Sequence, residues 1–196
     1  MERLLGLAGG RGPLIVLDEA YADFAGETLI RWGAELPNLL VARTASKAYG
    51  LAGLRCGFGV ANPKTALEVE KSRGPYKVSR LAAHAVASAI RDESGWMADA
   101  LRACRENRVR LWNELNARRL SPLDSHTNFI LFSAPSGSSR ADALALRSRN
   151  VGVRPFEGGP GVGEGLRVTV GPWPLMVRFL EALDDLLAEQ SGVEVG

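Results

Sequence analysis

Three short apolar runs in the first third of the chain set the strongest limit on its fold. Residues 13–17 and 38–42 are apolar at almost every position, and each run leads directly into charged and hydroxyl-bearing residues. A strand that is apolar at consecutive positions is buried on both faces, as in a parallel sheet covered by helices. Residues 56–60 form a third such run, so we expect an α/β sheet rather than a β-sandwich.

The rest of the chain predicts helices and then a second, α+β arrangement. Asn62-Pro63 is a helix start signal, so we expect a helix over residues 64–73, and Ser79 can cap a second one that runs to residue 90. A weak interruption at Gly95 precedes a long helix that ends near Arg119. The second half continues as strand, helix, strand, strand and helix, over residues 128–132, 140–149, 151–154, 166–170 and from Pro172 or Pro174 onward. The expected apolar faces are Leu101, Val109, Leu111 and Leu115 in the long helix, and Leu175, Phe179, Leu183 and Leu186 in the last one. This order predicts one domain over residues 1–95 and another over 96–196.

Composition excludes several classes of protein. Of the 196 residues, 46% are hydrophobic and 23% are charged, which is typical of globular proteins rather than disordered or fibrous ones. No apolar run reaches the length of a membrane-spanning helix, and residues 1–12 lack the pattern of a signal peptide. We therefore expect a cytoplasmic protein that binds no membrane. Two cysteines are too few for a disulfide framework or a four-cysteine zinc site, and no metal is expected.

Several motifs are better explained by structure than by function. The glycine-rich residues 158–165 resemble a phosphate-binding loop but lack its lysine, and a strand rather than a helix follows them. His84 and His126 have no third ligand in view, so both are expected to be structural. The arginines within residues 102–119 have Glu106 and Glu114 among them and few aromatic residues. They predict a solvated helix face, and no nucleic-acid partner.

Polar side chains gather where the first three strands end or begin, which is where open α/β sheets place their ligands. They supply a carboxylate, a phenol, two hydroxyls, an amine and a guanidinium, from Asp18, Tyr21, Thr44, Ser46, Lys47 and Arg55. One ligand needs all of these groups, namely a pyridinium aldehyde that carries a phosphate. Its carbonyl needs an amine, its ring nitrogen a carboxylate, and its phosphate hydroxyls and an arginine.

These residues also occur in a recognisable order. Residues 18–24, followed by 43–58 with the core Ser-Lys-x-x-Gly-Leu-x-Gly-x-Arg, resemble the pyridoxal-phosphate-dependent aminotransferases of fold type I, and most closely the histidinol-phosphate aminotransferase branch. The resemblance continues through residues 74–79, 127–131 and 166–171. It implies an α/β fold, with the C-terminal part of the family's large domain, a mostly parallel sheet, followed by the small α+β C-terminal domain.

The resemblance implies a role for each residue around the cofactor, pyridoxal 5′-phosphate. Lys47 would form the Schiff base and then move a proton between the substrate's α-carbon and C4′ of the cofactor. Asp18 would pair with the pyridinium nitrogen, and Tyr21 would hydrogen-bond the 3-oxygen. The remaining three, Thr44, Ser46 and Arg55, would hold the phosphate.

The substrate side of the site is implied in the same way. Arg167 would bind an acidic group of the substrate, Arg154 a second anion, and Asn128 would lie near the site. Tyr76 would reach toward the active site of the partner subunit, which implies a homodimer. The implied partners are an amino donor and a 2-oxo acid, in the conversion of histidinol phosphate and 2-oxoglutarate to imidazole acetol phosphate and glutamate in histidine biosynthesis.

Each of these residues taken alone has an ordinary structural explanation. An Asp at a strand end is more often a turn residue than a catalytic acid, a lone Lys is usually a solvated charge, and an Arg such as Arg55 usually forms a surface ion pair. The combination favours the cofactor site. The chain has only four lysines, at positions 47, 64, 71 and 77, so a chance match at Lys47 is less probable.

Length leaves the function open between three hypotheses. Family members are much longer, and this chain is expected to lack the upstream segment that supplies the floor beneath the cofactor. It would then be the C-terminal part of an aminotransferase. The alternatives are a fragment that is non-catalytic or needs a complementing chain, and a phosphothreonine decarboxylase-like enzyme with the same cofactor.

Overall fold

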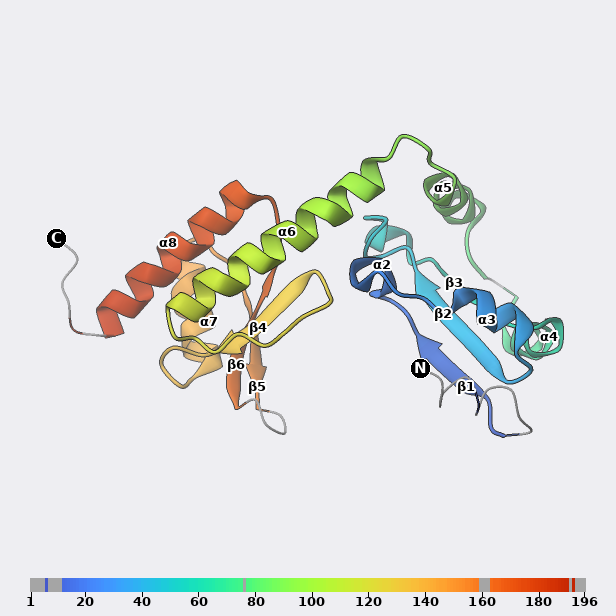
Figure 1. The fold of residues 1–196 in the computed structure, drawn as a ribbon, viewed down its shortest axis with the longest axis horizontal. Coiled ribbons are helices and arrows are strands. Elements are labelled where there is room, and N and C mark those ends of the chain that lie inside the picture. The colour runs from blue at the N-terminus through green and yellow to red at the C-terminus, as the bar shows by residue number, and fades with distance from the viewer. Residues whose placement is uncertain (1–5, 7–11, 76, 159–162, 191, 193–196) are drawn as a thin grey trace. The chain divides into compact units, whose positions relative to one another are not determined.

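A computed structural model describes residues 6, 12–75, 77–158, 163–190 and 192 of the chain. The chain divides into two compact units, Met1–Ala98 and Asp99–Gly196, and each has its own sheet (Figure 1).

The first unit is built on a three-stranded sheet in the order β1-β2-β3. The strands are β1 (Ile15–Asp18), β2 (Leu39–Thr44) and β3 (Gly57–Val60). β1 and β2 are parallel, and Asp18 lies beside Ala42 in their register. β2 and β3 are antiparallel, and Thr44 lies beside Gly57. The described strands of this sheet thus form one parallel and one antiparallel pair.

The first unit also contains several helices. They are α2 (Ala22–Ala25), α3 (Ile30–Glu35), the short 3₁₀ helix η1 (Ala52–Leu54), α4 (Pro63–Ser72) and α5 (Arg80–Ile90). The sequence predicted α4 and α5 together with their caps. The Asn62 side chain accepts hydrogen bonds from the backbone N–H groups of Lys64 and Thr65, and the Ser79 hydroxyl accepts one from Ala82.

One face of the first sheet is covered by α3. Leu39 and Val41 of β2 are fully buried against Leu29, Ile30 and Trp32. α3 approaches closely because position 33 is glycine, where a Cβ atom would lie 2.5 Å from the carbonyl oxygen of Val60. On the opposite face Val16 is 61% exposed, although its apolar run predicted burial on both faces.

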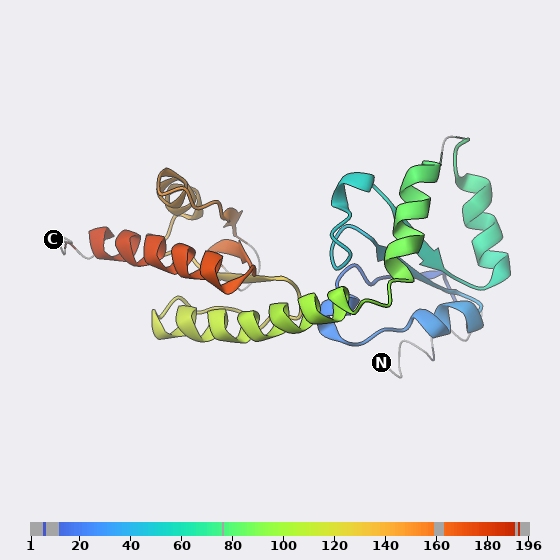
Figure 2. The same cartoon turned by 90° about the horizontal axis from the view of Figure 1, so that it is seen from above.

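The second unit is a sheet covered by helices on one face. After α6 (Trp96–Ala117), which begins in the last residues of the first unit, come β4 (Phe129–Ser133), α7 (Ser139–Ser148), β5 (Arg154–Glu157), β6 (Glu164–Thr169) and α8 (Trp173–Gln190). The sheet order is β4-β6-β5, and both pairs are antiparallel. Figure 2 shows α8 between α6 and α7. The core side chains of β4 and β6, Ile130, Phe132, Leu166 and Val168, face these helices.

The predicted order of elements in the second unit is confirmed, but several details differ. α5 ends at Ile90, and Gly95 has a left-handed φ of 82°, so the interruption before α6 is a full break. Residues 151–153 precede β5 rather than belonging to it, because the N–H of Val151 bonds back to Leu146 at the end of α7. Val109 is 61% exposed and Leu175 is 53% exposed, so neither belongs to the core.

Among the described residues, no helix is both long enough and apolar enough to cross a bilayer. The same residues contain no group of three or more His, Cys, Asp or Glu side chains that could hold a metal ion.

Candidate active site

Three of the predicted residues, Asp18, Thr44 and Arg55, come together at one edge of the first sheet, the edge where β1 and β2 end and β3 begins. Asp18 is the last residue of β1 and Thr44 the last residue of β2. Arg55 precedes β3 by two residues, and a parallel β3 would have placed it at the far edge of the sheet. Because β3 is antiparallel and Gly57 pairs with Thr44, Arg55 comes to the same edge as Asp18 and Thr44.

Lys47 and Tyr21 are brought into contact from different segments of the chain. Lys47 lies in the turn after β2, where its carbonyl accepts a hydrogen bond from the N–H of Gly50 at 3.1 Å. Tyr21 is the residue immediately before α2. The amine of Lys47 lies over the phenol ring, 5.4 Å from its centroid. The Lys47 side chain is exposed and makes no ion pair within the described residues, so its amine is accessible to a ligand.

The hydroxyl and carboxylate groups at this edge are fixed by local hydrogen bonds. The Thr44 hydroxyl accepts from the N–H of Ser46 at 3.1 Å, which closes the turn toward Lys47. One carboxylate oxygen of Asp18 accepts from the N–H of Ala20 at 2.9 Å. These bonds hold the side chains in place without removing them from solvent, since Asp18 remains exposed.

Arg55 adopts a backbone conformation that is unusual for a residue with a side chain. Its φ of 49° and ψ of 43° are left-handed, a conformation that costs a non-glycine residue energy and that is often found at functional positions. Its guanidinium donates to the carbonyl of Ala52 at 3.2 Å and makes no ion pair within the described residues. An exposed guanidinium without a carboxylate partner suits an anionic ligand.

A buried charged cluster lies next to these residues, and the sequence reasoning assigned it no role. Arg43 contacts both Glu19 and Asp23, and its side chain is only 8% exposed. The Glu19 carboxylate also accepts from the N–H of Leu29 at 2.6 Å and from the Thr28 hydroxyl at 2.5 Å. One signal could have revealed this cluster: two acidic residues flank Tyr21, and one arginine follows the apolar run 38–42.

Tyr49 lies in the electrostatic field of this cluster. Burial raises the pKa of the Tyr49 phenol, and the nearby Asp23 carboxylate raises it further, while Arg43 acts in the opposite direction. Ionisation of the phenol is therefore moved further from neutral pH.

The predicted substrate arginines belong to the second unit. Arg154 and Arg167 occupy directly opposite positions on β5 and β6. They share a face with Leu131 of β4, which is the face that the helices do not cover. The Arg167 guanidinium lies over the ring of Phe129, 4.8 Å from its centroid. The carbonyl of Asn128 accepts from the N–H of Val170 at 2.8 Å, and Tyr76 lies outside the described residues.

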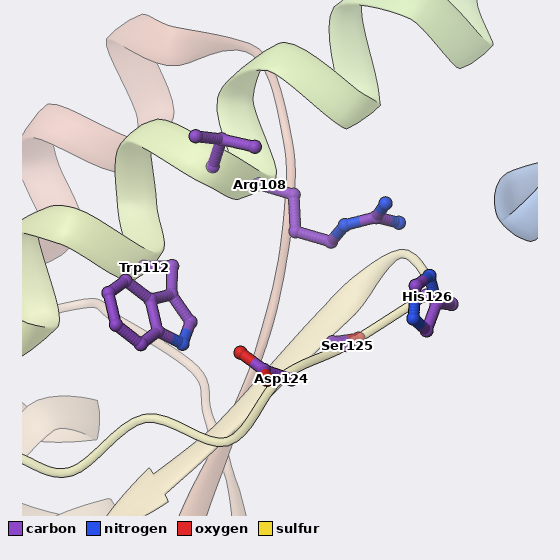
Figure 3. A pocket seen from close by; sticks show the side chains of 6 residues that line it. Arg108, Trp112, Asp124, Ser125 and His126 are labelled. Carbon is purple, nitrogen blue, oxygen red and sulfur yellow. The ribbon is translucent and has the colours of Figure 1, made fainter.

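The second unit also contains a hollow of about 380 Å³ between α6 and the segment before β4. Arg108 and His126 extend toward each other at one end of it, and Trp112 and Asp124 lie at the other (Figure 3). Arg108 donates to the carbonyl of Thr127 at 2.7 Å, and burial lowers the pKa of its guanidinium. None of the predicted site residues lines this hollow.

Known proteins resemble this chain in sequence over most of its length. Residues 1–183 match the family model "Aminotransferase class I and II". Histidinol-phosphate aminotransferase 2 of Gluconobacter oxydans is 36% identical over 180 residues, and the match covers 90% of this chain and 50% of that protein. The histidinol-phosphate aminotransferase of Syntrophotalea carbinolica is also 36% identical, over 92% of this chain and 51% of its own length. The chain thus spans about half the length of the curated relatives it matches.

Solved structures give a consistent result. The histidinol-phosphate aminotransferase of Sinorhizobium meliloti, solved in complex with pyridoxal 5′-phosphate, has a TM-score of 0.79 and 29% identity, over 96% of this chain and 53% of that one. The L-threonine-O-3-phosphate decarboxylase of Porphyromonas gingivalis has a TM-score of 0.80 and 27% identity, over 95% of this chain and 58% of that one. On the extent of these matches, the chain belongs to the aminotransferase class I and II family.

Proposed function

We propose that this chain carries the lysine-bearing part of a pyridoxal-phosphate-dependent aminotransferase that acts on histidinol phosphate and 2-oxoglutarate in histidine biosynthesis. The observation that carries the proposal is the accessible Lys47 amine over the Tyr21 ring, at the edge to which Asp18, Thr44 and Arg55 also come. The names of the relatives support the choice of substrate.

The chemistry of the side chains at this edge fits pyridoxal 5′-phosphate. The cofactor offers a carbonyl for an amine, a ring nitrogen for a carboxylate, a 3-oxygen for a phenol, and a phosphate for hydroxyls and a guanidinium. Each of these protein groups is present, and the amine and guanidinium make no ion pair within the described residues. When bound, the cofactor supplies a ring that takes up the electron pair left at a substrate's α-carbon.

The residues of this chain then have separate tasks. Lys47 would bind the cofactor's carbonyl carbon, and its amine, once the substrate's amine has displaced it, would move the proton at the substrate's α-carbon. Asp18 keeps the proton on the ring nitrogen, and Tyr21 donates to the 3-oxygen. Arg55 binds the phosphate with the hydroxyls of Thr44 and Ser46, because a guanidinium paired with a phosphate forms strong, charge-assisted hydrogen bonds.

The second unit would bind the substrate's anionic groups. Arg154 and Arg167 place two cationic side chains next to each other on the open face of the sheet, and a phosphorylated substrate needs such groups. Asn128 immediately precedes β4 of the same sheet and would line the site.

The domain roles and the assembly are part of the same proposal. Residues 1–95 would form part of the cofactor-binding large domain, and residues 96–196 the small C-terminal domain. The protein would be a cytoplasmic homodimer in which Tyr76 reaches the partner's site. The other half of the relatives' length would supply the remainder of the cofactor site.

A decarboxylase is the second candidate. The structural similarity to L-threonine-O-3-phosphate decarboxylase is of the same order as that to the aminotransferases. Both reactions need an amine, a cofactor and an anion-binding pair, so this chain's residues suit either one. Which bond breaks depends on how the substrate is held.

A complementation assay tests the proposal. The chain is mixed with the half of the Gluconobacter oxydans relative that it does not match, produced as a separate polypeptide, and supplied with pyridoxal phosphate. We expect the mixture, but neither part alone, to form glutamate from histidinol phosphate and 2-oxoglutarate, and Lys47→Arg to abolish this. Release of carbon dioxide from phosphothreonine would favour the decarboxylase, and a mixture without any Lys47-dependent reaction would favour a non-catalytic fragment.

A further inference from the structure

The buried cluster around Arg43 connects the two segments that supply Tyr21 and Lys47. Glu19 and Asp23 lie two residues before and two residues after Tyr21, and both pair with the single guanidinium of Arg43. Arg43 itself lies near the end of β2, four residues before Lys47. One side chain therefore ties the segment that carries Tyr21 to the strand that leads to Lys47.

The two arms of the Arg43 guanidinium have separate partners. Nη1 donates to Glu19 at 3.3 Å and to the Thr28 hydroxyl at 3.3 Å, while Nη2 donates to Asp23. The planar guanidinium fixes the angle between these contacts, which an ammonium on a flexible stem cannot do. The cluster thus sets an orientation for the Tyr21 segment as well as offsetting part of the negative charge of Glu19 and Asp23.

Glu19 is also held by groups other than Arg43. The carboxylate oxygen that Arg43 does not contact accepts from the N–H of Leu29, and the Thr28 hydroxyl donates to the same oxygen as Arg43. Glu19 is 8% exposed, and a buried carboxylate with several donors is held firmly in place. Tyr21 is therefore carried on a short segment that is anchored at Glu19 and again at Asp23.

We propose that Arg43 is a positioning residue, which by binding Glu19 and Asp23 on either side of Tyr21 sets the place of the Tyr21 ring beneath the amine of Lys47. The inference rests on the proposed function only for the roles of Tyr21 and Lys47 toward the cofactor. The contact itself is a property of the chain and can be measured without cofactor.

The test uses the small number of lysines. With ¹³C-labelled lysine, the four ε-methylene groups give a simple NMR spectrum, and Lys47→Arg identifies the signal of Lys47. When a lysine amine lies over an aromatic face, the ring shifts the NMR signal of the adjacent ε-methylene group upfield. We expect this shift for Lys47 in the unmodified chain, its retention in Tyr21→Phe and its loss in Tyr21→Ala.

The positioning role is tested with three changes in the cluster. Arg43→Lys keeps the positive charge but loses the two-armed guanidinium. Glu19→Gln and Asp23→Asn each keep a hydrogen-bond acceptor but lose the negative charge. We expect each change to move the Lys47 signal toward the signals of the other lysines. Arg118→Lys is the matched control, because Arg118 also bridges two carboxylates, Glu114 and Asp184, but in the second unit. It should leave the Lys47 signal unchanged.

The outcome that would overturn the proposal is equally specific. The proposal is wrong if the Lys47 signal keeps its upfield position in both Asp23→Asn and Arg43→Lys while the rest of each spectrum is that of the folded protein. An unshifted Lys47 signal in the unmodified chain would overturn it as well. Neither result depends on the cofactor, so a failure of the proposed function leaves this test intact.

Discussion

Arg154 and Arg167 lie directly opposite each other on neighbouring antiparallel strands, and neither makes an ion pair within the described part of the chain. Like charges in opposite positions destabilise a sheet. A bound anion would relieve that repulsion, which gives the pair a measurable property of its own.

We expect inorganic phosphate to raise the melting temperature of the chain through this pair. At a phosphate concentration about tenfold above the dissociation constant, the stabilisation should be about 1.4 kcal/mol. Arg167→Gln should reduce the increase to whatever the phosphate-binding residues around Arg55 contribute, while Arg147→Gln, an exposed change on α7, should preserve it in full. Melting curves in phosphate and in chloride at equal ionic strength make the comparison, and an equal increase in both variants would contradict it.

Gly33 should not tolerate a methyl group. In Gly33→Ala the added Cβ would lie 2.5 Å from the Val60 carbonyl oxygen, and neither backbone segment can move away freely. We expect a loss of about 1–3 kcal/mol in the free energy of unfolding, beyond any gain of up to about 1 kcal/mol in helix propensity. Gly53→Ala, where no atom lies within 4 Å of the added Cβ, is the control in urea denaturation. Equal stability of the two variants would show that α3 does not pack as described.

Two leucines of α8 should differ sharply in their contribution to stability. Leu183 is fully buried, whereas Leu175 is 53% exposed. We expect Leu183→Ala to cost about 2–5 kcal/mol and Leu175→Ala about 0.5 kcal/mol or less. Chemical denaturation followed by circular dichroism measures both. A large cost at Leu175 would restore the helix face that the sequence predicted.

The hydrogen bonds of Ser139 to Glu164 should make stability depend on pH. The Ser139 hydroxyl and its backbone N–H both donate to the Glu164 carboxylate, and these bonds lower the pKa of Glu164 below its ordinary value of 4.5. A lowered pKa stabilises the fold above pH 4.5, and the contribution is lost as the pH falls through the lowered value.

Ser139→Ala should therefore be less stable than the unmodified chain at pH 7, and the difference should shrink in strong acid, where the carboxyl group is protonated. Ser148→Ala is the control, because the Ser148 hydroxyl donates to a carbonyl, that of Ala145, which does not titrate. Urea denaturation at both pH values measures the difference. A deficit at Ser139 that is the same at both would contradict this account.

The features that the sequence predicted well are those that depend on local chemistry. The Asn62 and Ser79 caps and the apolar runs of β1 and β2 each report on a few adjacent residues. The direction of β3 is not set by a few adjacent residues, because it depends on the path of the chain between Thr44 and Gly57. That connection contains only the short η1 helix, which suits an antiparallel return better than a parallel crossover.

The site divides in the same way. Lys47, Tyr21 and Arg55 could be selected from residue types and their order. The cluster of Glu19, Asp23 and Arg43 could not, because charged residues are ordinarily solvated and only the folded chain shows that these are buried. The prediction that Val109 and Leu175 lie on the apolar faces of their helices was wrong for a related reason, since an apolar residue at a helical spacing can still face solvent.

The central claim is that Lys47 is the amine that binds pyridoxal phosphate. In the complementation mixture described above, the cofactor is added, sodium borohydride fixes any lysine-bound adduct, and mass spectrometry of peptides measures the modified fraction at each of the four lysines. We predict modification concentrated at Lys47, absent in Lys47→Arg, and markedly lower when the chain is alone. An adduct spread evenly over Lys47, Lys64, Lys71 and Lys77, or one that persists elsewhere at the same level in Lys47→Arg, would contradict the claim.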